Sequence, residues 1–93
     1  MFVGVLTIEL HIFESGSLKS KRSVVKGLKD RIRSRFNVSV AEVADNDLWQ
    51  RATLGVACVS GEKAHAVEML NKVMDLVRSN TSAELIDYQI EVM

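Results

Sequence analysis

Cysteine, proline and aromatic residues are scarce in this sequence. Its 93 residues include one cysteine, Cys58, no proline, and 5% aromatic side chains. One cysteine cannot form an internal disulfide, and no group of cysteines and histidines has the spacing of a zinc site. No apolar run approaches the ~20 residues that a membrane-spanning helix needs, and the N-terminus does not resemble a signal peptide. We therefore expect a cytoplasmic protein with no metal or other cofactor and no membrane partner.

Recognisable catalytic motifs are missing as well. The sequence contains no Ser/His/Asp arrangement, Walker loop or GxGxxG motif. His11 and His65 are far apart and lack ligand spacing, so we expect both to be solvated. The stretch Asp45-Asn46-Asp47 lacks the glycine and the terminal glutamate that complete a calcium loop. These absences predict a protein that is not an enzyme and has no catalytic residue.

The charged residues are balanced in number but unevenly distributed. Twelve lysines and arginines oppose twelve aspartates and glutamates, so the formal net charge is zero. Residues 17–35 hold eight of the basic residues and one acidic residue, Asp30, and carry a net charge of +7. The remaining residues hold four basic and eleven acidic groups and carry −7. Such a basic segment favours an anionic partner, which the total charge alone would argue against.

Hydrophobic periodicity predicts the first half of the fold. Residues 2–12 alternate with a period of two, as a β-strand does, and the stretch 14–17 ends that alternation. From Leu18 to about Phe36 the period becomes 3.6 residues, with Ser17 suited to be the helix N-cap and Asn37 the C-cap. A second strand then runs through Val38, Val40 and Val43, with a bulge expected at Val40-Ala41.

The second half repeats this layout. A strand over residues 53–59 is followed by a helix that opens at Ser60-Gly61 and extends to about Ser79. In the last strand the apolar positions alternate strictly with polar ones and are Ile86, Tyr88, Ile90 and Val92. The order is therefore β-α-β-β-α-β.

This order predicts an α+β fold of the ferredoxin-like type. Two right-handed β-α-β crossovers of this length give a four-stranded antiparallel sheet with both helices on one face. We expect the first and third strands in the centre and a single domain over residues 1–93, because no linker or low-complexity segment interrupts the chain.

One face of the predicted sheet has no helix over it. Alternation places a modest apolar patch there, formed by Val3, Val5, Ala57 and Val59. Such a patch fits either scattered surface residues or a partner. A homodimer through the open sheet face, or along an edge strand, is therefore an open alternative. The open face has no aromatic residue, which argues against the base-stacking sheet of an RNA-recognition motif.

The first predicted helix arranges its cations in a stripe. At 100° per residue, one continuous row lies beside the buried face and consists of Lys19, Arg22, Lys26, Lys29 and Arg33. Lys21 falls on the apolar side and must either snorkel or find a partner. The cations of the first turns lie at the positive end of the helix dipole, a conflict that a bound anion would relieve. The alternative is a solvated face whose charge is balanced by acidic groups elsewhere.

Trp49 is the only tryptophan and lies between the second and third strands. Together with Gln50 and Arg51 it forms a candidate contact site for a partner. The interpretation we favour is that the ring folds back over the end of the core, because a large aromatic side chain is costly to expose. Cys58 alternates with Leu54 and Val56 and is predicted to be an inert core thiol.

Four segments of the chain resemble a known family. They are Val3-Gly4-Val5-Leu6 and the stretches 17–22, 36–43 and 47–52. Together they resemble the bacterial "domain of unknown function 503" family, also called YlxP-like, over essentially the whole chain. The resemblance implies a ferredoxin-like fold and a small cytoplasmic protein of uncharacterised function. It also implies a link to ribosome assembly or translation, since genes of this family often lie near those for translation initiation and ribosome-binding factors. It offers no catalytic residues.

The leading prediction is a small binding protein that contacts RNA or a ribosomal surface through the basic first helix. The candidate residues for nucleic-acid or anion contacts are Lys19, Lys21, Arg22, Lys26, Lys29 and Arg33. Two alternatives stay open. One is a homo-oligomeric interaction module with an acidic protein partner, and the other is a sensor that binds a small anion at Gly16-Ser17.

Overall fold

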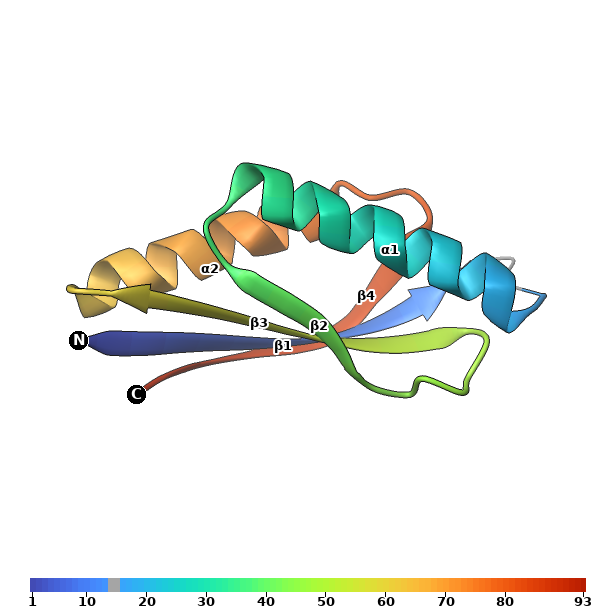
Figure 1. Ribbon diagram of the computed structural model, residues 1–93, viewed down its shortest axis with the longest axis horizontal. Coiled ribbons are helices and arrows are strands. Elements are labelled where there is room, and N and C mark those ends of the chain that lie inside the picture. Colours follow the sequence, from blue (N-terminus) through green and yellow to red (C-terminus); the bar gives the residue numbers. More distant parts are fainter. Residues whose placement is uncertain (14–15) are drawn as a thin grey trace.

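The computed structural model describes residues 1–13 and 16–93, so two positions of the predicted break after the first strand, Glu14 and Ser15, lie outside the described residues. The elements are β1 (Phe2–Ile12), α1 (Leu18–Arg35), β2 (Ser39–Ala44), β3 (Arg51–Ser60), α2 (Lys63–Arg78) and β4 (Ala83–Val92). The sheet has the order β2-β3-β1-β4 with antiparallel neighbours, and both helices cover one face of it (Figure 1). The predicted ferredoxin-like fold, with β1 and β3 in the centre, is confirmed.

The hydrophobic core lies between the helices and the sheet. β1 buries every second side chain against the helices, namely Leu6, Ile8, Leu10 and Ile12. α1 contributes Val25, Leu28 and Ile32, and α2 contributes a row that includes Leu70, Val73 and Met74. Fully burying an aliphatic side chain of this size contributes about 1.5–3 kcal/mol. This interior therefore fixes which side of α1 faces outward.

The helix ends follow local hydrogen bonds and differ in detail from the prediction. The Ser17 side chain accepts a hydrogen bond from the Ser20 N–H at 3.1 Å, which confirms the predicted N-cap of α1. The C-cap of α1 is Phe36, one residue before the predicted Asn37, because Phe36 is extended and packs against the core. α2 begins at Lys63 rather than at Ser60-Gly61, since Ser60 still pairs with Phe2 in the sheet.

Both edge strands contain an irregularity that alternation did not locate. In β2 the register shifts between Glu42 and Ala44, two residues beyond the predicted bulge, and leaves Val43 58% exposed. In β4 the register shifts opposite Glu9 and Leu10, so Ile86 has no partner in β1 and does not take the core-facing position predicted for it. Leu85 pairs with Leu10 instead, and the strand begins at Ala83. A bulge changes the face of every residue before or after it, so strict alternation over 86–92 was wrong at its first position.

Neither α1 nor α2 combines the length and the apolar character that crossing a membrane would require.

Candidate nucleic-acid interface

The cationic stripe of α1 faces outward. Because Val25, Leu28 and Ile32 anchor the opposite side of the helix in the core, the stripe residues remain at the surface. These residues are Lys19, Arg22, Lys26 and Arg33, all exposed, and Lys29, partly exposed. Five of the six residues predicted to contact nucleic acid or anions thus lie along one side of one helix, which is 18 residues long.

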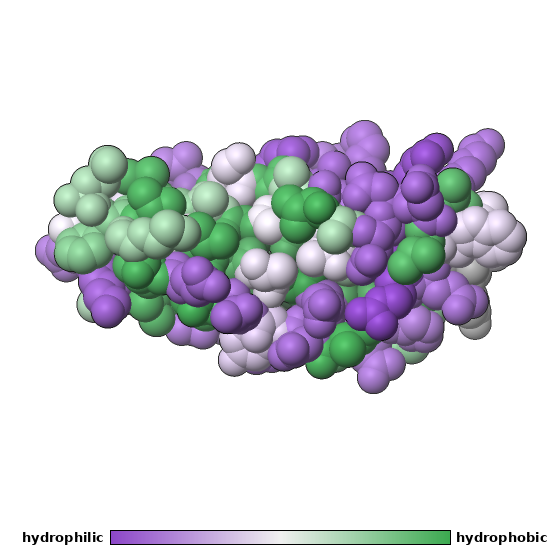
Figure 2. All heavy atoms as spheres, turned by 90° about the horizontal axis from the view of Figure 1, so that it is seen from below, coloured by the Kyte–Doolittle hydropathy of each residue, from purple (hydrophilic) through white to green (hydrophobic). Residues whose placement is uncertain are grey.

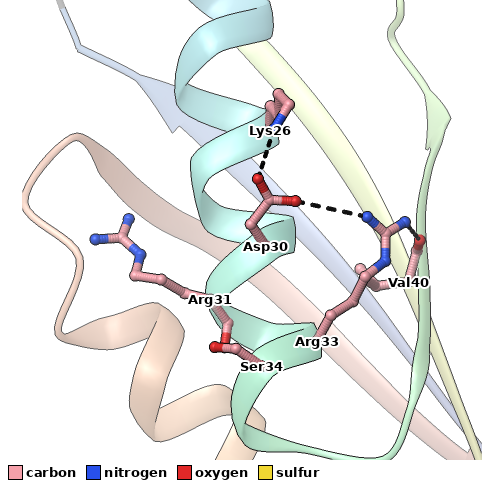
Figure 3. Close-up of polar contacts among 6 residues, drawn as sticks. All are labelled: Lys26, Asp30, Arg31, Arg33, Ser34 and Val40. Carbon is pink, nitrogen blue, oxygen red and sulfur yellow. Dashed lines mark hydrogen bonds and ion pairs between the residues drawn. The ribbon is translucent and has the colours of Figure 1, made fainter.

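Asp30 organises the middle of this stripe. Its carboxylate lies 2.6 Å from Lys26 Nζ and 3.8 Å from Arg33 Nη1. The Arg33 guanidinium also donates a hydrogen bond of 2.8 Å to the Val40 carbonyl of β2 (Figure 3). The hydrogen bond from Lys26, aided by the charges of Lys26, Arg33 and Lys29, lowers the pKa of Asp30 despite some desolvation. The one acidic residue of α1 is therefore shared between two cations.

Lys21 does not belong to the outer surface. It is completely buried, and its Nζ lies 2.9 Å from Glu42 Oε2 in β2 and donates a hydrogen bond to the Asp45 carbonyl. The prediction that it snorkels or finds a partner is resolved in favour of a partner. Because a buried ammonium group cannot reach a ligand at the surface, Lys21 is removed from the set of candidate contact residues.

The rest of the positive charge on α1 is not neutralised from outside. Glu42 offsets one charge, so residues 17–35 together with Glu42 still carry +6. Within residues 1–13 and 16–93, no carboxylate lies within ion-pair distance of Lys19, Arg22 or Lys29. In the part of the chain that the structure describes, an acidic group from the rest of the fold thus pairs with one of the eight basic residues of 17–35. The alternative of a basic helix balanced from outside explains that one residue and not the others.

Some of the hydrogen-bond donors of the predicted anion site at the start of α1 are already used within the protein. The N–H of Ser20 is used by the Ser17 cap, and the N–H of Lys21 donates to the Ser17 carbonyl at 3.2 Å. The Lys21 ammonium group points inward. The cations left near Gly16-Ser17 are Lys19 and Arg22, both exposed.

The loop between β2 and β3 holds its aromatic side chain outward. Trp49 is 53% exposed and the neighbouring Leu48 is 48% exposed, so the interpretation that Trp49 folds back over the core was wrong. Gln50 and Arg51 are exposed as well. The Gln50 carbonyl accepts a hydrogen bond of 2.8 Å from the Ile12 N–H, which fixes the loop to the end of β1. The three candidate contact residues therefore form one exposed segment.

Asp45 connects this loop to α1, a role that the sequence analysis did not predict. Its carbonyl accepts hydrogen bonds from Lys21 Nζ and from the Leu48 N–H, and its carboxylate accepts one of 2.8 Å from Thr53 Oγ1. Its φ of 63° lies in the left-handed region, which an aspartate tolerates better than most residues. The connection between β2 and β3 is thereby held at the end of the molecule where α1 begins (Figure 1).

The other candidate positions are structural. Cys58 is buried as predicted, and its Sγ lies 3.9 Å from the Ala66 carbonyl. His65 shares a hydrogen bond of 3.2 Å with Ser60 Oγ at the start of α2. In the part of the chain that the structure describes, no three histidine, cysteine, aspartate or glutamate residues are grouped as a metal site would require.

The open face of the sheet is apolar over one half and polar over the other. Figure 2 views the molecule from this side and shows hydrophobic residues gathered over the half that holds the two chain termini. The most exposed of them are Met1, Val59 and Met93. Val3 pairs with Val59 and lies beside them in the sheet.

Comparison of the sequence with known proteins found a matching family and a relative in Bacillus subtilis. A family model described as "Protein of unknown function (DUF503)" matches residues 3–90. The uncharacterised protein YlxP of Bacillus subtilis (strain 168) is 36% identical over 77 residues, which cover 83% of this chain and 84% of YlxP.

Two solved structures share the fold at low sequence identity. A de novo designed protein with a ferredoxin fold is 11% identical, with a TM-score of 0.55 over 98% of this chain and 85% of its own. The ACT domain from GTP pyrophosphokinase of Chlorobium tepidum is 12% identical, with a TM-score of 0.51 over 100% and 97%. At these identities the likeness concerns the fold alone.

Proposed function

The chain belongs to the DUF503 family, whose function is unknown, and from this premise we propose that it is a non-enzymatic cytoplasmic protein that binds structured RNA through the outer side of α1. The RNA is either free or part of a ribosomal surface. The observation that carries this proposal is the charge of the cationic stripe, where five cations face one acidic residue, Asp30, and leave a net charge of +4. Clustered lysines and arginines on one face are the electrostatic footprint of a nucleic-acid binder.

The geometry of α1 suits a phosphate backbone. From Lys19 to Arg33 the stripe extends about 21 Å at 1.5 Å per residue. Ser23 and Gly27 lie beside it and are exposed. Apart from the helix's own backbone, no atom of the described residues would lie within 4 Å of a Cβ placed on Gly27. Small side chains next to a row of cations allow a polyanion to approach the helix closely.

Trp49 offers a contact of a different kind at one end of this surface. An exposed aromatic ring stacks on an unpaired base with a gain of about 1–3 kcal/mol. Its loop is tied to α1 through the contact between Lys21 and the Asp45 carbonyl. We therefore expect a preference for RNA in which a helical stem, whose phosphates contact α1, adjoins an unpaired base.

The test compares two matched pairs of charge reversals. Lys26→Glu with Lys29→Glu changes the outer side of α1, and Lys63→Glu with Lys72→Glu makes the same charge change on α2. The pairs are matched because Lys26 and Lys72 each have an acidic partner four residues away on the same helix. Binding of a fluorescent RNA stem-loop is measured by anisotropy between about 50 and 200 mM salt.

We expect the α1 pair to weaken binding more than tenfold and to flatten the slope of log K against log salt by about 1.5, since each lost phosphate contact removes about 0.7–0.9 from it. The α2 pair should change affinity much less. Equal effects of the two pairs would indicate attraction by net charge alone and would contradict the proposal, as would affinity that does not fall with salt. Co-sedimentation with ribosomal subunits under the same salts tests whether the RNA is ribosomal.

A second candidate function rests on the open sheet face. We propose that its apolar half pairs two copies of the chain, because Met1, Val59 and Met93 are each at least 65% exposed there. Large exposed apolar patches commonly mark interaction sites. Sedimentation equilibrium of the wild-type protein should then show a dimer, and Val59→Asp should shift it to the monomer. A wild-type protein that is monomeric at high micromolar concentration would rule this out.

A further inference from the structure

We propose that the groove between the C-terminal half of α1 and the connection from α2 to β4 binds a phosphate group. The groove consists of two adjoining hollows that share Arg31. One is lined by Arg31, Arg35, Asn80 and Thr81, among others, and the second by Ser23, Gly27 and Ser82. Its two arginines are not part of the cationic stripe, although the second hollow borders the stripe at Ser23 and Gly27. The phosphate-site proposal does not depend on the RNA-binding proposal.

The two arginines supply the charge of the groove. Arg31 leaves α1 on the side opposite Arg33, and in Figure 3 its guanidinium points away from Asp30 toward the segment that follows α2. Within the described residues, neither Arg31 nor Arg35 has a carboxylate at ion-pair distance. Asp75, an acidic residue in the last turns of α2, lies 3.7 Å from Arg78 of the same helix. The groove therefore holds two positive charges without a partner.

Asn80 adds a buried donor. Its Oδ1 accepts a hydrogen bond of 2.7 Å from the Ser82 N–H, so the orientation of the amide is fixed. Its Nδ2 is buried and has no hydrogen-bond partner among the residues that the structure describes. Buried donors without a partner are rare in folded proteins because each one loses its hydration without compensation. An acceptor atom of a ligand in the groove would give the Asn80 Nδ2 group its missing hydrogen-bond partner.

Two carbonyls next to the groove, those of Leu76 and Val77, are already occupied. The last carbonyls of α2 accept hydrogen bonds from the residues that follow it: Leu76 O from Ser79 Oγ at 2.7 Å, and Val77 O from the Asn80 N–H at 3.1 Å. The C-terminal end of a helix carries about half a negative charge, which two guanidinium groups outweigh. The groove is left with donors to offer and requires a ligand rich in acceptors.

A phosphate group meets this requirement better than a carboxylate. Guanidinium groups bind phosphate through two parallel N–H···O bonds, and phosphate has further oxygens for the Asn80 amide and the Thr81 hydroxyl. The second hollow is open above Gly27, so there is room for the rest of a phosphorylated molecule. The phosphate is either that of a small phosphate monoester or that of an RNA strand.

The experiment is an NMR titration of the isotope-labelled full chain with three probes: inorganic phosphate, a nucleoside 5′-monophosphate, and a short RNA strand. The reporters are the Asn80 side-chain amide and the backbone amides of residues 79–82. The variants are Arg31→Gln and Asn80→Asp. The second variant keeps the side-chain oxygen that accepts the hydrogen bond from the Ser82 N–H, but it replaces the Nδ2 donor with an oxygen. Lys63→Gln is the control, because it removes one positive charge from an exposed position at the start of α2, outside both the groove and the cationic stripe.

We expect at least one probe to shift these signals, with a tenfold or greater loss of affinity in Arg31→Gln and a small change in Lys63→Gln. Saturation by phosphate or the mononucleotide identifies a small-ligand site, and saturation by RNA alone identifies a phosphate of the strand. If Asn80→Asp fails to fold by circular dichroism, Arg31→Gln decides the question. The proposal is overturned if no probe moves the reporters, or if Lys63→Gln weakens binding as much as Arg31→Gln does.

Discussion

Replacing Lys21 with methionine tests the buried ion pair that ties α1 to β2 and to the Trp49 loop. The side chains of Lys21 and Glu42 are 1% and 14% exposed, and their charged atoms lie 2.9 Å apart. Methionine keeps the length of lysine but leaves the Glu42 carboxylate without its counter-charge. Removing one partner of a buried pair costs about 3–5 kcal/mol. Because water reaches Glu42 in part, we expect a loss near the lower end, about 3 kcal/mol.

A second substitution separates the lost attraction from the lost packing. In Lys21→Met with Glu42→Met no charge remains to be stabilised, and such apolar replacements of a buried pair are often neutral. We expect the double variant to recover to within about 1 kcal/mol of the wild type. In a domain of this size each kcal/mol changes Tm by roughly 4–8 °C, so the single variant should melt about 12–24 °C lower. Lys29→Met, at a partly exposed position of α1, is the control and should change stability by less than about 0.5 kcal/mol.

The effect of these substitutions on the Trp49 loop can be measured separately from their effect on the stability of the fold. Urea unfolding followed by circular dichroism gives the free energy of unfolding, while tryptophan fluorescence reports on the loop alone because Trp49 is the only tryptophan. Both methionine variants lack the bond from Lys21 to the Asp45 carbonyl, so acrylamide should quench Trp49 more strongly in both. A loss below about 1 kcal/mol in Lys21→Met, or a double variant no more stable than the single one, would refute the reasoning.

The remaining predictions concern two glycines and one carboxylate. Gly27→Ala should stabilise the protein by about 0.8–1 kcal/mol, because alanine is favoured inside a helix and, apart from the helix's own backbone, no described atom lies within 4 Å of the new Cβ. Gly4→Ala should destabilise it by about 1–3 kcal/mol, since its Cβ would lie 3.0 Å from Leu70 Cδ1 in the core. Urea unfolding measures both, and changes of the same sign would contradict the packing described. The hydrogen bond from Lys26 lowers the pKa of Asp30, so Lys26→Gln should raise that pKa in an NMR titration. Because the pKa is lower in the folded state, any stabilisation is present above the unfolded value of about 3.9 and is lost as the pH falls through the folded one. An Asp30 pKa that stays unchanged in Lys26→Gln would show that another group causes the shift.

The order of elements was predictable because each one buries a single face. The alternation of β1 and the 3.6-residue period of α1 are local properties, and the topology follows from their order. The bulges were not predictable at the level of a residue. Whether Val43 or Ile86 faces the core depends on the register with a neighbouring strand, and a shift of one residue exchanges the two faces without changing the sequence pattern.

The candidate site was only partly predictable for the same reason, because the register of an edge strand is not visible in the sequence pattern. The position of Lys21 on the apolar side of α1 indicated that it needs a partner, but the predicted bulge at Val40-Ala41 would have turned Glu42 to the open face. Because the shift instead follows Glu42, its carboxylate stays on the helix side and reaches Lys21. Glu42 is thereby used in the interior and is not available to neutralise the outer stripe. The position of one bulge in an edge strand thus links the buried ion pair, the outward Trp49 loop and the positive charge on which the proposed function rests.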